Sequence, residues 1–261
     1  MPSRANNRGV AVSHKVLIGK GRYLARLAES DDDIARVLAL RARVFRPGQV
    51  PASDADAFDP ACRHVMVETR DSGDLVGCCR ILSFGSDRDI AQSYSAQFYD
   101  LTRLSHLPGP LAEVGRLCAA PEGADADSLR LTWAALASVL DAMGARFLFG
   151  CTSFPGTDPG AYLDAFALLH DRHAAPAPLR PGVKAPAVFG FARAGANGGV
   201  PARGLRQIPP LLRSYLALGG WVSDHAVIDR DLGTLHVFTG LDVGAMPEGR
   251  KKLLRAMAGP S

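Results

Sequence analysis

Residues 112–118 read AEVGRLC, a run in which Glu113 and Arg116 are the only charged side chains. With Pro110 and Pro121 on either side, the apolar and small residues of this run predict a buried strand. Burying a carboxylate and a guanidinium is costly unless the two groups are paired or hydrogen-bonded. The pair therefore indicates either a core salt bridge or a functional site.

The spacing of the two charged residues adds a second observation. Residues three apart in a regular strand point to opposite faces of a sheet. Gly115 lies between them and permits a β-bulge, and bulges beside active sites re-aim side chains. We therefore expect a bulge in this strand.

The composition indicates a globular protein of a reducing compartment. The 261 residues are 47% hydrophobic and 21% charged, which is ordinary for a soluble protein of one large domain or two small ones. The five cysteines are an odd number and include no Cys-x-x-Cys pair, so the sequence predicts neither a disulfide framework nor a structural zinc site. His170 and His173 lack a third ligand at metal-binding spacing, so we expect no metal site. No apolar run approaches the ~20 residues that span a bilayer, so we expect no membrane-crossing segment.

The charges are segregated along the chain. The net charge is +4, and no Asp or Glu occurs in residues 1–28 or in residues 172–223, although both segments contain several Lys or Arg residues. A third basic cluster occupies residues 250–255. These regions indicate an anionic partner, such as an acidic protein, lipid headgroups or nucleic acid, or else solvated basic faces.

The order of predicted elements is that of a mixed α/β protein. The sequence predicts a mobile basic arm over residues 1–20 and a single domain over residues 21–261, in which residues 172–207 form a basic Pro/Gly-rich insertion. Strands are expected over 23–27, 64–69, 75–84, 112–118, 146–151, 187–191, 221–228 and 234–238, and helices over 31–45, 127–143, 158–170 and 208–218. The strands 64–69 and 75–84 would form a hairpin that turns at residues 71–74, and Ser30 would cap the first helix. Neither a Gly-x-Gly-x-x-Gly loop nor a Walker loop is present, so nucleotide-binding folds are unsupported.

Four pieces of the first half of the chain form a shared signature. They are Arg41-x-x-x-Phe45, Asp56-x-x-Asp59, Arg80 and Glu113-x-x-Arg116. In this order and spacing the chain resembles, over about residues 22–150, two families with the acetyltransferase-like (GNAT) fold. One is the acyl-homoserine lactone synthases, and the other is the bacterial ornithine N-acyltransferases.

The second half of the chain favours the ornithine N-acyltransferases. Residues 149–159, 208–212 and 226–231 are similar to motifs of that family, and the homoserine lactone synthases are usually shorter. The chain departs from the family pattern over residues 232–236, which read LGTLH.

The resemblance implies a fold and a reaction. The fold would be a GNAT-like α/β (α+β) fold, with a central mixed, mostly antiparallel twisted sheet flanked by helices. The reaction would transfer a 3-hydroxyacyl group from acyl carrier protein to the α-amine of L-ornithine, giving lyso-ornithine lipid. No cofactor is implied, because the acyl donor is a thioester on the carrier protein.

The resemblance also suggests roles for the signature residues. A buried Glu113 is a reasonable base, because burial raises the pKa of a carboxylate toward neutrality. Arg116 and Arg80 would bind the substrate carboxylate or orient Glu113. The remaining candidates for substrate binding are Arg41, Phe45, Asp56, Asp59 and Asp229. Among them, the three aspartates would pair with the δ-ammonium or serve as turn and cap residues, and Phe45 would line an acyl pocket or belong to the core.

The same resemblance gives the basic regions a role. Acyl carrier protein is acidic and the lipid product belongs in an anionic membrane surface, so we expect a cytoplasmic protein peripheral to the inner membrane and no nucleic-acid partner. Three alternatives stay open: a homoserine-lactone-type synthase, an enzyme that acylates another amino acid such as lysine or glutamine, and a non-enzymatic basic binding protein.

Overall fold

The computed structural model describes residues 16–49, 53–85, 90–195 and 200–244, together with residues 246 and 249. The basic cluster 250–255 and residues 1–15 of the predicted arm lie outside the described residues. Residues Val16–Lys20 form strand β1, which pairs antiparallel with β2 (Tyr23–Leu27). The predicted arm therefore extends 5 residues too far, because Leu17 and Ile18 pack against the hydrophobic core.

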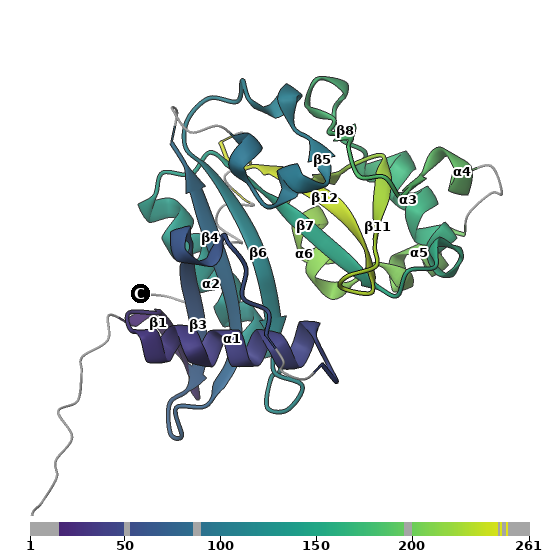
Figure 1. The fold of residues 1–261 in the computed structure, drawn as a ribbon. Coiled ribbons are helices and arrows are strands. Elements are labelled where there is room, and N and C mark those ends of the chain that lie inside the picture. The colour runs from purple at the N-terminus through teal and green to yellow at the C-terminus, as the bar shows by residue number, and fades with distance from the viewer. Residues whose placement is uncertain are drawn as a thin grey trace, which may run out of the picture.

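Helix α1 (Asp31–Phe45) forms where the sequence predicts it. The Ser30 hydroxyl accepts the backbone N–H of Asp33 as an N-cap, and three aspartates in the first turn complement the helix dipole. The apolar face of α1, with Val37 and Leu40, packs on one face of the predicted hairpin of β3 (Arg63–Thr69) and β4 (Leu75–Phe84). Helix α2 (Ala126–Ala142) covers the opposite face of the same strands (Figure 1).

The central sheet is mixed and mostly antiparallel, as predicted. Its order is β1-β2-β3-β4-β6-β7-β12-β11-β9, and β10 pairs with β12. The later strands are β6 (Leu111–Ala119), β7 (Phe147–Pro155), β9 (Val188–Gly190), β10 (Trp221–Val222), β11 (His225–Asp229) and β12 (Thr234–Asp242). Among the described strands, β6 and β7 form the one parallel pair.

The remaining helices cluster around the second half of the sheet. They are α3 (Leu163–His173), α4 (Ala192–Gly195), α5 (Pro201–Gln207) and α6 (Pro210–Ala217). The helix predicted over 158–170 is divided, because residues Pro159–Tyr162 form a 3₁₀ turn before α3 begins. The basic segment 172–207 is built into the fold, since it supplies β9 to the edge of the sheet and β8 (Gly182–Val183) to a pairing with β5 (Tyr99–Asp100).

The two parallel strands separate in the middle of the sheet. Strands β6 and β7 pair only from Leu111–Phe147 to Glu113–Phe149, and beyond that point they diverge (Figure 1). At the point of separation Gly150 is required, because a Cβ atom there would lie 2.2 Å from the carbonyl oxygen of Val114. The divergence opens a gap in the sheet that side chains line on both sides. None of the helices in the described part of the chain combines the length and the apolar character needed to cross a bilayer.

Candidate active site

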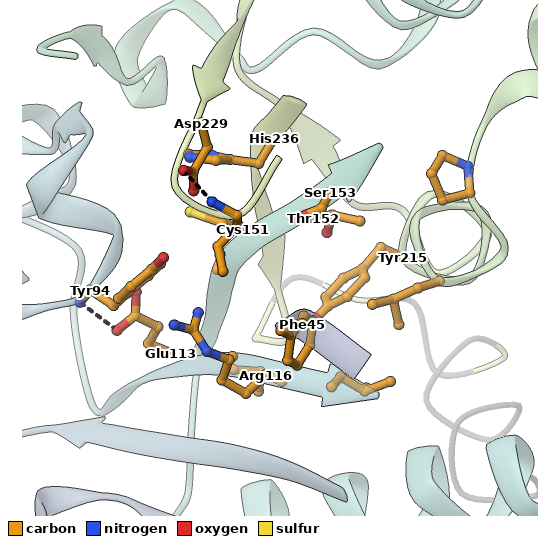
Figure 2. A pocket seen from close by; sticks show the side chains of 17 residues that line it. Phe45, Tyr94, Glu113, Arg116, Cys151, Thr152, Ser153, Tyr215, Asp229 and His236 are labelled. Carbon is orange, nitrogen blue, oxygen red and sulfur yellow. Dashed lines mark hydrogen bonds between the residues drawn. The ribbon is translucent and has the colours of Figure 1, made fainter. Parts of the chain in front are cut away.

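A pocket of about 260 Å³ occupies the gap between β6 and β7. The end of α1 contributes Phe45 to its wall (Figure 2). The turn between β11 and β12 contributes Leu232, and the start of α6 contributes Leu211. Glu113 and Arg116 both line this pocket. The charged pair that stands out in the sequence therefore lies at a cavity rather than in the closed core.

A β-bulge brings these two side chains to one cavity. Cys78 of β4 lies opposite Cys118, and Arg80 lies opposite Gly115, so β6 contains one more residue than β4 between these points. Arg116 occupies the extra position with φ 52°, and it is the one non-glycine residue with positive φ in the described part of the chain. The predicted bulge is confirmed, but the left-handed residue is the arginine itself rather than the glycine. This backbone conformation is uncommon for a long side chain, and it turns Arg116 toward the pocket.

Glu113 is buried and carries three hydrogen bonds. Its Oε2 accepts the backbone N–H of Tyr94 at 2.8 Å, and its Oε1 accepts the backbone N–H and the hydroxyl of Ser95 at 2.7 and 2.6 Å. Burial raises the pKa of Glu113 above its ordinary value, although the hydrogen bonds from Ser95 and Tyr94 oppose the rise. The carboxyl group thus holds the segment that carries Tyr94 and has the raised pKa that a base needs.

Arg116 lies between two aromatic rings at the pocket wall. The centre of its guanidinium is 4.9 Å from the centroid of the Tyr94 ring and 5.6 Å from that of Phe45. Its Nε donates to Oδ2 of Asp54 at 2.8 Å, and its Nη2 lies 3.4 Å from Oδ2 of Asp56. Figure 2 shows the guanidinium on the same side of β6 as the Glu113 carboxylate. Arg116 is therefore a fixed cation facing the cavity.

The other signature residues form an ion-pair network behind this wall. Asp59 accepts hydrogen bonds from Arg41 at 2.6 Å and from Arg80 at 2.7 Å, and Arg80 also donates to Asp56 at 2.6 Å. Burial opposes ionisation of Asp59, but the bonds from Arg41, the Asp56 backbone and Arg80 hold its pKa at about 2. None of these four residues lines the pocket. The structure brings the predicted residues together, yet it engages the two aspartates with arginines rather than presenting them to a substrate.

Asp229 lies on the opposite wall of the pocket from Arg116. It is 7% exposed, and its Oδ1 accepts the backbone N–H groups of Asp231 and Leu232, each at 3.0 Å. Within the described part of the chain, Oδ2 of Asp229 has no hydrogen bond, so this oxygen is available to a ligand. The turn is anchored by Arg46 at the end of α1, which donates to the carboxylate and the carbonyl of Asp231 at 2.6 and 3.0 Å.

Tyr94, in the pocket wall, gave no sequence signal because it comes from an irregular segment. Cys151 lies within the stretch 149–159 that resembles the motif of the ornithine N-acyltransferases. Burial raises the pKa of Cys151 to about 12, so its thiol stays protonated near neutral pH. Burial likewise lowers the pKa of His236 to about 4 and keeps its ring neutral. Because both Leu232 and His236 line the pocket, the LGTLH departure falls within the pocket wall.

The sequence comparisons with known proteins agree on an N-acyltransferase. Residues 40–134 match the acetyltransferase (GNAT) domain family. An L-ornithine N(alpha)-acyltransferase of Rhodobacter capsulatus is 33% identical over 88% of this chain and 93% of its own length. A protein of the same name from Brucella abortus is 31% identical over 87% of both chains. The solved structure of a CoA-dependent acyl-homoserine lactone synthase, BjaI, aligns over 88% of this chain and 85% of its own with 10% identity and a TM-score of 0.47.

Proposed function

The chain belongs to the L-ornithine N(α)-acyltransferase family, and from that premise we propose that it transfers a 3-hydroxyacyl group from acyl carrier protein to the α-amine of L-ornithine. The product is a lyso-ornithine lipid. The observation that carries this proposal is a single cavity with a fixed guanidinium, Arg116, on one wall and an available carboxylate oxygen, Asp229 Oδ2, on the other.

This arrangement matches the charges of a diamino acid. The α-carboxylate of ornithine pairs with Arg116, since a guanidinium binds a carboxylate through two parallel hydrogen bonds. The δ-ammonium pairs with Asp229 across the cavity. The α-amine then lies between the two anchors, on the side of Glu113.

The proposed reaction is direct attack of the α-amine on the thioester carbonyl. The α-ammonium first gives up one proton. A C–N bond then forms, the C–S bond breaks, the attacking nitrogen gives a second proton to a base, and the carrier thiolate leaves and takes up a proton. A typical α-amine has a pKa near ~8 and a lysine-like δ-amine one near ~10.4, so deprotonating the α-amine costs roughly 3 kcal/mol less. Pairing the δ-ammonium with Asp229 reinforces this preference, because it stabilises the charged form of the δ-amine.

Glu113 is the proposed base, and in this proposal it takes the proton of the amine through a water molecule. Both carboxylate oxygens already accept protein hydrogen bonds, but a carboxylate has about four acceptor positions, so capacity remains. A backbone N–H of the bulge near Gly115 is the proposed donor to the developing oxyanion. No covalent acyl-enzyme is needed, and Cys151, as a protonated thiol, is a poor nucleophile.

Mass spectrometry of lipids from a heterologous host that expresses this chain tests the proposed function. We expect ornithine carrying one amide-linked 3-hydroxyacyl chain. Lysine or glutamine conjugates would show a different acceptor, and an acyl-homoserine lactone would overturn the proposal. A host expressing the Glu113→Gln chain provides the background.

We further propose that acyl carrier protein docks beside α5 and α6. Arg206 and Arg213 are exposed and flank Pro209, which lines the pocket, whereas Arg203 is already paired with Asp164 at 3.0 Å. Arg206→Glu with Arg213→Glu should raise the KM for acyl carrier protein at least severalfold and leave the KM for ornithine unchanged. For the wild type, the KM for the carrier should rise with ionic strength, because screening weakens steering between opposite charges.

The matched control reverses two exposed charges elsewhere, Lys20→Glu with Arg63→Glu on β1 and β3. If both double variants raise the KM for acyl carrier protein equally, or if that KM does not depend on salt in the wild type, the docking surface lies elsewhere.

The same basic surface supports a second proposal, reversible attachment to anionic membranes. Each Lys or Arg near such a surface contributes about 1 kcal/mol, so a few residues suffice. Cell fractionation should find the protein partly with membranes at low salt and released at roughly 0.5–1 M salt, where the Debye length falls to a few ångströms. Release by detergent alone would contradict attachment by charge.

A further inference from the structure

We propose that Asp54 is a positioning residue that aims Arg116 at the acceptor and thereby sets the affinity for the acceptor's carboxylate. This inference rests on the proposed function, in which Arg116 binds that carboxylate. Asp54 itself does not line the pocket.

Asp54 joins the pocket arginine to the most deeply buried arginine of α1. Its Oδ2 accepts from Nε of Arg116 and from Nε of Arg41, both at 2.8 Å. Its backbone carbonyl accepts Nη2 of Arg41 at 2.6 Å, and Arg41 is fully buried in α1. Asp54 is therefore fixed to a helix through two bonds, one to its carboxylate and one to its backbone carbonyl, and its carboxylate in turn holds Arg116 in place.

Arg116 needs such a partner. It occupies the left-handed position of the bulge, a backbone conformation that long side chains rarely adopt, so its side chain depends on contacts with other residues for its orientation. Its contact with Asp56 is long, at 3.4 Å, so the 2.8 Å bond to Asp54 is the shorter of its two carboxylate contacts and orients the guanidinium. With Nε engaged by Asp54, the opposite side of the guanidinium faces the cavity between the rings of Tyr94 and Phe45 (Figure 2). A bidentate bond to a carboxylate depends on that orientation.

The other oxygen of Asp54 points to a role beyond packing. Asp54 Oδ1 and Arg46 Nε are both buried without a hydrogen-bond partner, and they lie 3.8 Å apart. A sub-ångström shift brings them within hydrogen-bond distance. Since Arg46 also holds the Asp231 turn, Asp54 stands between the arginine that faces the substrate and the arginine that anchors the opposite wall. The position of Asp54 Oδ1 and Arg46 Nε therefore fits a pocket in which these two atoms move into hydrogen-bond distance when the acceptor binds.

The test separates the carboxylate contact from general stability. Asp54→Asn keeps the shape and one acceptor oxygen but removes the charge that holds Arg116. We expect the KM for ornithine to rise about tenfold, the order lost with one charge-assisted hydrogen bond, and the KM for acyl carrier protein to stay within about twofold. The inhibition constant of 1,4-diaminobutane, which is ornithine without its carboxylate, should stay within about twofold.

The control is Glu68→Gln, which weakens a comparable buried ion pair with Arg26 and Arg36 at the far end of the sheet. It should lower the melting temperature without changing the KM for ornithine. If Asp54→Asn does not fold, Asp54→Glu, which displaces the carboxylate by one methylene, takes its place. It should likewise raise the KM for ornithine and leave the inhibition constant of 1,4-diaminobutane nearly unchanged.

An unchanged KM for ornithine in Asp54→Asn, or an equal weakening of ornithine and 1,4-diaminobutane, would overturn the assignment of Asp54. A wild type that does not acylate ornithine would instead overturn the proposed function. In that case the same comparison in Asp54→Asn is made with the amino acid that the wild type does accept and with its decarboxylated analogue. A loss confined to the amino acid supports the role of Asp54, and an equal loss of both overturns it.

Discussion

Replacing Glu113 with glutamine is expected to lower kcat by about 10²-fold or more, the usual scale for loss of a general base. The structure adds a second reason for a large effect. The carboxylate accepts backbone N–H groups from both Tyr94 and Ser95, so the amide of glutamine would set one NH₂ group against an N–H donor. Steady-state turnover at saturating ornithine and acyl carrier protein measures the effect.

The pH dependence distinguishes a base from a residue that only holds its neighbours. Burial raises the pKa of Glu113, and the base must be deprotonated, so kcat/KM of the wild type should fall as pH drops through this raised value. The Ser95 hydroxyl bonds the charged form and lowers that pKa, so Ser95→Ala should move the acid limb to higher pH while keeping most of the activity. An acid limb that stays in place in Ser95→Ala, together with near-normal turnover of Glu113→Gln at pH 7, would leave Glu113 as the anchor of the Tyr94 segment alone.

Replacing Asp229 with asparagine should lower kcat/KM for ornithine by about tenfold to hundredfold, since a hydrogen bond between charged groups is worth about 1.5–3 kcal/mol. The change should spare the fold. Asp229 Oδ1 accepts the two N–H groups of the turn, and the asparagine oxygen can keep both bonds. Competition assays with mixed amino acids measure the specificity.

Norvaline, which has the carbon chain of ornithine without the δ-amine, is the matched substrate. Its kcat/KM should stay the same or rise in Asp229→Asn, so the preference for ornithine over norvaline should collapse. If both substrates lose equally, Asp229 supports the turn and does not bind the δ-ammonium.

The sequence predicted those parts of the structure that local patterns determine. The N-cap at Ser30, the hairpin of β3 and β4 and the bulge at Gly115 each depend on a few neighbouring residues, and all three are confirmed. The sequence places residues 16–20 in a mobile arm, because a five-residue strand next to a basic segment shows its pairing only when β2 lies beside it.

The candidate site was predictable only in part, because its ion pairs join distant segments. Arg41 and Asp59 read as separate candidates for substrate binding, yet they form a buried ion pair across 18 residues of sequence. Asp54 went unnoticed, since an aspartate in an Asp-rich loop looks like a turn residue until Arg41 and Arg116 converge on it. Tyr94 is held in place by Glu113, a contact that no spacing rule encodes.

The long pairing of β7 with β12 bears on how the protein is made. Strand β12, the last in the described chain, pairs with β7 along its whole length, from Thr234–Pro155 to Asp242–Phe147. At synthesis rates of about 5–20 residues per second, the interval between the completion of β7 and that of β12 is roughly 4–17 s. During this interval β7 has neither β12 beside it nor the Asp229 wall across the gap, and an unpaired strand edge is prone to association with other chains. The nascent chain therefore passes through a stage at which it is both inactive and open to aggregation, and the strand that ends this stage also completes the pocket.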